Sequence, residues 1–166
     1  MRDDPGFDDV LESNAAYAAG FGLAGLEPRA ARGLAIVTCM DSRIEPLAML
    51  GLVPGDAKIL RNAGARVTDD VLRTLVLSRY LLGVERVMVV AHTQCRMADG
   101  TEQEVHAAIE AAGGPDTSEI SFLVATDQEE AIRADVQRAQ SSPYLNGVAI
   151  GGFLYDVDTG RITGIC

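Results

Sequence analysis

Three chemically reactive residues stand close together in the segment VTCMDSRIEP, residues 37–46. Cys39 can supply a thiolate, Asp41 a carboxylate and Arg43 a guanidinium, and all three follow an apolar run. Such a set could be a nucleophile with its supporting groups, part of a metal site, or a paired turn. The spacing alone leaves these alternatives open, so the answer depends on what else the fold brings near Cys39.

A second reactive pair lies in the segment AHTQC, residues 91–95, again at the end of an apolar run. His92 and Cys95 are three residues apart, so both side chains can face one point as the chain leaves a strand. Two thiolates and one imidazole suit Zn²⁺, at ligand distances of about 2.0–2.3 Å. Three protein ligands leave a fourth position open for water, whose pKa the metal lowers. If Cys39 lies beside this pair, the sequence predicts a catalytic type of zinc site.

The elements that must position these residues can be read from the hydrophobic pattern. Continuous apolar runs of strand length are typical of parallel strands that are covered on both faces. Amphipathic patterns with capping residues at their starts separate these runs and indicate helices. The expected strands occupy residues 34–40, 57–65 and 86–93, the expected helices 67–83, 101–113 and 126–143, and a terminal hairpin 147–165.

Strands that alternate with helices predict an α/β fold with a mainly parallel β-sheet flanked by helices. In the order 2-1-3-4, with the terminal hairpin strand added, the first and third strands are neighbours, and the crevice at their carboxyl ends is the usual ligand site. Cys39, His92 and Cys95 would therefore meet there. Asn62 and Gly64 end the strand next to the first. We expect them to border a substrate pocket, although both residue types are also common in turns.

The length of 166 residues and the 48% hydrophobic content predict a single domain, residues 1–166, with a substantial core. Residues 1–32 are expected to form an N-terminal helical arm. The pattern of residues 6–19 is that of an amphipathic helix with Phe7 and Leu11 in its apolar stripe. This arm could pack on its own domain or reach onto a neighbouring copy.

The net charge of −10 argues against nucleic-acid binding and against docking on anionic membranes, because both need clustered basic residues. No apolar run reaches the roughly 18 residues of a membrane-spanning helix. The acidic start of the chain lacks the apolar core of a signal peptide, so we expect a cytoplasmic protein. Three cysteines do not make a secreted disulfide framework, and in a reducing compartment they are buried, catalytic or metal-bound.

Together, the two motifs resemble those of the β-class carbonic anhydrases. CMDSR, residues 39–43, matches the family pattern C-x-D-x-R, and HTQC, residues 92–95, matches H-x-x-C. The segment RNAGA, residues 61–65, and the order of elements from residue 33 to the hairpin are also similar. The two motifs in this order are highly specific, whereas either alone would be a weak signal. The resemblance is to the small prokaryotic subtype of the family.

The resemblance implies a zinc-dependent carbonate dehydratase, in which zinc-bound hydroxide reversibly hydrates carbon dioxide to bicarbonate and a proton. Cys39, His92 and Cys95 would be the zinc ligands, and Asp41 and Arg43 the catalytic dyad beside the metal. We expect Arg43 to hold Asp41 off the metal through a bidentate pair. The family also implies a homodimer or a multiple of dimers, with the site near the subunit contact.

Two residues depart from the family pattern. Arg96 stands where the family usually has glycine, and Gln94 where this subtype often has aspartate. Neither change removes a ligand, but both bear on rate and substrate preference. A hydrolase of carbon disulfide or carbonyl sulfide with the same metal site, and a non-enzymatic zinc-binding relative, therefore stay open as alternatives. A phosphatase-type Cys39 nucleophile is disfavoured, because Glu45 occupies the position of the arginine that cradles phosphate.

Overall fold

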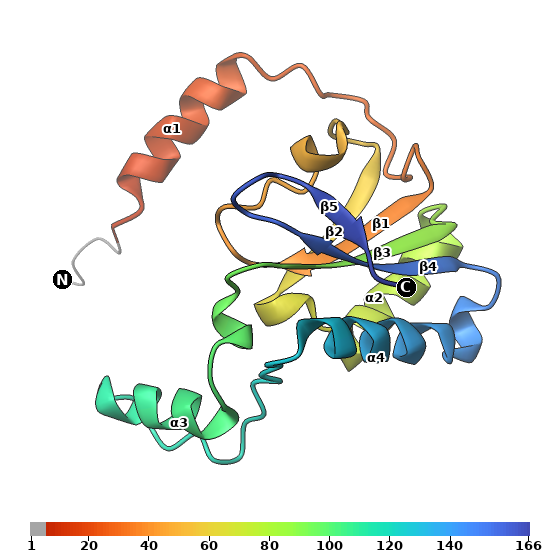
Figure 1. The fold of residues 1–166 in the computed structure, drawn as a ribbon. Helices are drawn as coiled ribbons and strands as arrows, with labels where there is room; N and C mark the ends of the chain where they lie inside the picture. Colours follow the sequence, from red (N-terminus) through yellow and green to blue (C-terminus); the bar gives the residue numbers. More distant parts are fainter. Residues whose placement is uncertain (1–5) are drawn as a thin grey trace.

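The computed structural model describes residues 6–166, so the first five residues of the expected arm lie outside the described part. Five strands form one sheet in the order β2-β1-β3-β4-β5 (Figure 1). The strands are β1 (Leu34–Cys39), β2 (Ala57–Asn62), β3 (Arg86–His92), β4 (Ala149–Tyr155) and β5 (Ile162–Gly164). The helices are α1 (Asp8–Ala19), α2 (Asp69–Leu81), α3 (Glu102–Ala111) and α4 (Gln128–Gln140), with short 3₁₀ turns η1 (Ala48–Leu50), η2 (Ala63–Ala65), η3 (Arg96–Ala98) and η4 (Pro143–Leu145).

Strands β2, β1, β3 and β4 pair in parallel, and β5 pairs antiparallel with β4. This topology confirms the α/β fold with a mainly parallel sheet and a terminal hairpin. The second strand was expected to end near Asn62 and Gly64, and the structure confirms this. The strand ends at Asn62, because Gly64 has a left-handed backbone (φ +79°) and the chain turns there into η2. The carboxyl ends of β1 and β3 lie next to each other, as a shared ligand site requires.

Strand β1 is buried along its whole length, which explains its uninterrupted apolar sequence. On one face of the sheet, Val37 and Val89 pack under α2 and α4, which contribute Leu75 and Ile132 to the same core. The opposite face carries no such pair of helices among the described residues. It is covered in part by the segment 47–52. That face is therefore only partly closed.

The N-terminal arm is the exception to this burial. Residues 6–29 are all exposed, and α1 stands away from the body of the protein (Figure 1). Helix α1, which is described in full, has no buried residue. Helix α3 also lies apart from the sheet in Figure 1, on the excursion between β3 and α4. Among residues 6–166, no helix combines the length and apolar character needed to cross a membrane.

Candidate metal centre

The centre lies where β1 and β3 end side by side. Cys39 is the last residue of β1 and His92 the last of β3. The parallel register places Thr38 opposite Val90, and the Thr38 hydroxyl donates a hydrogen bond to the Val90 carbonyl at 3.0 Å. Cys95 follows three residues after His92, in the loop that leads to η3. The sheet itself therefore fixes the two strand ends that carry the donors.

The structure brings the three expected donors together. One ligand atom from each of Cys39, His92 and Cys95 lies within 4.8 Å of the others, and the two sulfurs are 4.0 Å apart. The three residues are 4%, 0% and 5% exposed, respectively. These atoms come from residues up to 56 positions apart in the sequence. Their convergence in a buried site is the arrangement that a bound cation requires.

The imidazole of His92 is oriented for metal binding. Its Nδ1 lies 2.8 Å from the Thr93 carbonyl, and because a carbonyl only accepts, Nδ1 carries the proton. The lone pair is therefore on Nε2. This buried atom has no hydrogen-bond partner among the described residues, although buried polar atoms nearly always have one. An unpartnered nitrogen facing two sulfurs fits a zinc ion.

The two thiols interact strongly with each other. The hydrogen bond from Cys95 lowers the pKa of Cys39, against the effect of burial, and the same bond raises the pKa of Cys95. Because a thiol must lose its proton to bind a metal, a divalent cation held between the two sulfurs would favour both thiolates.

Asp41 and Arg43 form a bidentate pair at the edge of the centre. Arg43 Nε lies 3.0 Å from Asp41 Oδ1, and Nη2 lies 2.8 Å from Oδ2. The backbone N–H of Arg43 also donates to Oδ1, at 2.9 Å. The guanidinium holds the pKa of Asp41 well below its usual range, so the carboxylate is ionised. Asp41 Oδ2 lies 3.8 Å from Nε2 of His92, close enough for the carboxylate to serve the same centre.

The two residues expected at a substrate pocket have different surroundings. The N–H of Gly64 points at the Cys39 sulfur at 3.4 Å, and a Cβ on Gly64 would meet Met97 at 3.3 Å. The side chain of Asn62 instead closes the turn that follows β2. It accepts from the N–H of Arg66 at 2.8 Å and donates to its carbonyl at 2.7 Å. Gly64 therefore contacts the centre directly. Asn62 stabilises the turn that holds Gly64 beside Cys39.

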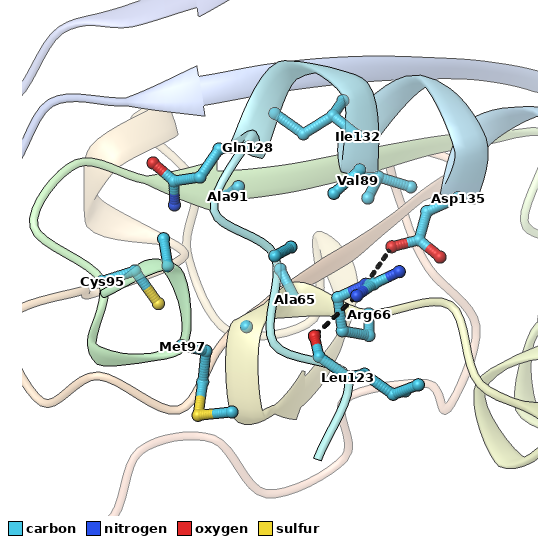
Figure 2. A pocket seen from close by; sticks show the side chains of 14 residues that line it. Ala65, Arg66, Val89, Ala91, Cys95, Met97, Leu123, Gln128, Ile132 and Asp135 are labelled. Carbon is cyan, nitrogen blue, oxygen red and sulfur yellow. Dashed lines mark hydrogen bonds and ion pairs between the residues drawn. The ribbon is translucent and has the colours of Figure 1, made fainter. Parts of the chain in front are cut away.

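A small cavity of about 20 Å³ lies beside Cys95 (Figure 2). Its lining is mostly apolar and includes Ala91, Met97 and Ile132. At one side Arg66 and Asp135 form an ion pair at 2.6 Å, which Figure 2 shows as a dashed line. The volume is enough for about one water-sized molecule. The Cys95 side of the centre thus borders a small, mostly apolar cavity.

The sequence patterns did not identify several residues that support the centre. Arg61 donates to the carbonyl of Cys39 at 2.9 Å and to that of Asp41 at 2.6 Å. Gln128, at the start of α4, donates to the carbonyl of His92 at 2.8 Å. These contacts join segments 20 to 36 positions apart, and no local spacing encodes them. The one available signal was that Arg61 begins the segment RNAGA, residues 61–65, which resembles the family.

Arg96, which replaces the usual glycine, points to solvent. Its side chain is 68% exposed and lies 3.5 Å from the Asp99 carboxylate, and it donates to the Asp99 carbonyl at 2.8 Å. The left-handed backbone in this loop belongs instead to Gln94, with φ +55°. A glycine is therefore not needed at position 96 for backbone reasons.

The family model for carbonic anhydrase matches residues 34–162. β-Carbonic anhydrase 1 of Mycobacterium tuberculosis is 37% identical over 159 residues, which cover 93% of this chain and 94% of that protein. The crystal structure of a carbonic anhydrase from Streptococcus mutans has a TM-score of 0.90 at 42% identity, covering 96% and 97% of the two chains. A carbon disulfide hydrolase from an Acidianus species is 45% identical over 74 residues, covering 45% of this chain and 36% of that protein. The chain therefore belongs to the β-carbonic anhydrases, a family of lyases.

Proposed function

We propose that the chain is a zinc-dependent carbonic anhydrase that reversibly hydrates carbon dioxide to bicarbonate and a proton. The observation that carries this proposal is the buried triad of Cys39, His92 and Cys95, whose unpartnered imidazole nitrogen lies 3.8 Å from an arginine-held carboxylate. A closed structural zinc site needs a fourth protein ligand, whereas a catalytic site keeps a position open. The three donors with an adjacent Asp41–Arg43 pair fit the second kind.

In this proposal Cys39, His92 and Cys95 hold the zinc ion. When bound, zinc would lower the pKa of a water molecule and so supply a nucleophile near neutral pH. The chain contributes the fixed positions of the donors. The Gly64 N–H donates to Cys39 Sγ, which stabilises the negative charge on that sulfur.

Arg43 and Asp41 act together as the proposed catalytic dyad. Without Arg43, the Asp41 carboxylate could turn toward His92 and occupy the open position itself. Three N–H groups of Arg43 bind the two carboxylate oxygens, which keeps the carboxylate directed at the guanidinium. A carboxylate oxygen has two lone pairs, so Asp41 can still accept a hydrogen bond from the attacking water and orient it.

The apolar cavity beside Cys95 is the proposed site for the uncharged substrate. Carbon dioxide is small and has no net charge, which suits a lining that includes Ala91 and Met97. Gly64 lets the backbone approach the centre closely, since a side chain there would press on Met97. We include Asn62 as the residue that fixes the turn, through its two hydrogen bonds to Arg66.

Carbon disulfide hydrolysis is the second candidate function. The stretch of 74 residues that is 45% identical to the Acidianus carbon disulfide hydrolase supports it. Carbon dioxide is favoured because the similarity to β-carbonic anhydrase 1 extends over 93% of the chain. A non-enzymatic zinc-binding role is disfavoured, because a purely structural site has no use for the Asp41–Arg43 pair.

We also propose that the chain works as a homodimer or a multiple of dimers. The arm exposes Phe7, Leu11 and Tyr17, while the half-open sheet face has a groove that contains Arg32 and Arg86. Helix α1 begins with two aspartates, so its charge complements that of the groove. A second copy could cover both surfaces at once.

A cytoplasmic location fits the two free thiols of the centre, which must stay reduced to bind metal.

The decisive experiment combines zinc analysis of freshly purified protein with stopped-flow assays of carbon dioxide hydration, with and without chelator. We expect one zinc per chain and activity that chelator removes. Parallel assays with carbon disulfide separate the second candidate. Zinc-loaded protein that turns over neither substrate would contradict both enzymatic proposals.

A further inference from the structure

A polar chain connects the hairpin turn to the catalytic dyad. The Asp158 carboxylate accepts a hydrogen bond from Gln94 Nε2 at 2.7 Å. Gln94 Oε1 in turn accepts from Arg43 Nη1 at 3.1 Å, and the Gln94 carbonyl accepts from Arg43 Nη2 at 3.2 Å. The amide of Gln94 is thus oriented from both ends, with its oxygen toward the cation and its nitrogen toward the anion. The segments so joined are 51 and 64 positions apart.

The far end of this chain is held by the β4–β5 turn. Asp156 accepts the N–H groups of Asp158 at 2.8 Å and Thr159 at 3.2 Å. The N–H of Val157 donates to the Thr93 hydroxyl at 3.1 Å, which ties the turn to the residue directly before Gln94. The Asp158 carboxylate therefore has a defined position relative to Gln94.

At the other end of this polar chain, the Arg43 side chain is partly exposed and needs contacts that fix its orientation. Arg43 is 45% exposed, and its bonds to Asp41 use only Nε and Nη2. The third nitrogen, Nη1, is held by Gln94. Gln94 reaches this position with a left-handed backbone, φ +55°, which is unfavourable for a residue other than glycine. Residues held in such a conformation cluster at functional sites, where the surrounding contacts maintain them.

We propose that Asp158 is a positioning residue, which acts through Gln94 to keep the Arg43 guanidinium in the orientation that binds Asp41. The Gln94 side chain is neutral, so by itself it interacts with the Arg43 guanidinium only through its amide dipole. The negatively charged Asp158 accepts from the amide nitrogen of Gln94 and so polarises the amide, which strengthens the bond from Arg43 to the amide oxygen. Asp158 does not touch the reacting atoms. This inference rests on the proposed function, since the dyad is part of that proposal.

The first test removes the carboxylate. We expect Asp158→Ala to lower kcat roughly three- to tenfold, with KM and zinc content close to those of the wild type, because one charge-assisted link to a catalytic side chain is lost. Asp158→Asn keeps the shape and should lower kcat less. Asp99→Ala is the matched control, since it removes an exposed aspartate paired with Arg96 in the neighbouring segment.

A charge swap then separates positioning from a merely structural role of the turn. Gln94→Glu alone would place two carboxylates against each other and should lower kcat at least as much as Asp158→Ala. In the double variant Gln94→Glu with Asp158→Asn, the same hydrogen bonds can form with the charge moved one residue closer to Arg43. We expect this double variant to recover most of the wild-type kcat. A double variant no better than Gln94→Glu would overturn the proposal.

A readout without turnover keeps this test distinct from the test of the proposed function. ¹⁵N NMR can measure solvent exchange of the Arg43 Nε–H, assigned with an Arg43→Lys variant. We expect severalfold faster exchange in Asp158→Ala and wild-type exchange in the double variant. If exchange in Asp158→Ala equals that of the wild type, the positioning role is wrong. If the wild type lacks carbon dioxide turnover but exchange follows the expected order, only the proposed function fails.

Discussion

The strand-exit centre and the N-terminal arm differ in how completely this single chain supplies their contacts. At the centre, Cys39 and His92 are buried at the ends of paired strands, and backbone groups of Gly64 and Thr93 contact Cys39 Sγ and His92 Nδ1. In the arm, residues 6–29 are exposed throughout, and Leu11 remains 64% exposed. The donors of the centre are thus held by buried contacts within this chain, whereas the arm exposes apolar side chains of the kind that a partner would bury.

This difference teaches that the proposed metal site and the proposed interface of the arm lie in separate parts of the chain. The donors depend on the register between β1 and β3, to which the arm contributes nothing. The apolar side chains of helix α1 are exposed rather than buried against the sheet. Substitutions in the arm should therefore leave metal binding intact, and substitutions at the centre should leave assembly intact.

The largest effect is expected at the sulfurs. Cys39→Ser replaces a thiolate by a hydroxyl, which is a poor zinc ligand, so we expect zinc content to fall to near zero and carbon dioxide hydration to fall by about 10³-fold or more. Zinc analysis and stopped-flow assays measure both. Cys166→Ser is the matched control, because Cys166 is exposed and distant in the sequence from the other two. Full zinc occupancy in Cys39→Ser would contradict the ligand assignment.

The second effect concerns the dyad. Arg43→Ala removes the two hydrogen bonds from the guanidinium to the Asp41 carboxylate, and we expect kcat to fall roughly 10²-fold while zinc stays bound. Arg96→Ala removes an exposed arginine of the adjacent loop and should keep wild-type activity. Equal activity in the two variants would mean that Arg43 is only a surface ion pair.

The third prediction moves to the arm. Leu11→Glu combined with Tyr17→Glu places charges in the exposed apolar stripe, and we expect the dimer dissociation constant to rise roughly a hundredfold if these side chains are interface anchors. Sedimentation velocity over a concentration series measures the change. Glu12→Gln on the same helix is the control. Zinc content should stay unchanged, and its loss would show that the two regions are not separate.

A fourth prediction compares a glycine of the packed sheet with a glycine of the arm. A Cβ on Gly152 in β4 would lie 2.3 Å from Ile132 and 3.1 Å from Val136, so Gly152→Ala should lower the free energy of unfolding by about 1–3 kcal/mol. Gly22 in the arm has no heavy atom within 4 Å of such a Cβ. Gly22→Ala should therefore leave stability unchanged in urea titrations. A similar loss in both variants would mean that the arm is packed.

The smallest expected effect is a pH dependence of folding stability at helix α3, which belongs neither to the centre nor to the arm. The Glu102 carboxylate accepts the N–H groups of Phe122 and Val124, and the bond from Phe122 holds the pKa of Glu102 below its ordinary value of 4.5. Because the folded pKa is the lower one, this stabilisation is complete above about pH 5 and is lost as pH falls below 4.5 through the folded value.

Unfolding titrations at pH 7 and pH 3.5 measure this dependence. We expect the difference in stability between wild type and Glu102→Gln to be larger at pH 7 than at pH 3.5. Glu110→Gln removes one negative charge from the same helix and serves as the control. The same difference at both pH values would show that the Glu102 carboxylate has no role in folding.

Much of the fold followed from the sequence, because its signals are local. The apolar runs and capped helices marked the elements, and the order 2-1-3-4 placed Cys39 beside His92 and Cys95, as the structure has them. Their roles as zinc ligands stay predictions, as do the roles of Asp41 and Arg43. The motifs were readable because each lies within five consecutive residues.

The supporting residues were not predictable, for a physical reason. Asp158 contacts Gln94 across 64 positions, and Gln128 contacts His92 across 36. Such contacts depend on rotamers and on the packing of whole elements, which hydrophobic periodicity does not encode. Gln94 was noted as a departure from the family, but its left-handed backbone and its two partners became visible only in the structure.

The pairing of Thr38 opposite Val90 has a consequence for how the chain can vary. Since adjacent strands, rather than the intervening polypeptide, set the distance between Cys39 and His92, the loop at residues 51–56 can gain or lose residues without displacing either one. A single insertion inside residues 34–39 is different, because it would turn Cys39 to the opposite side of the sheet. Evolutionary length changes should therefore accumulate between the strands and be absent within them.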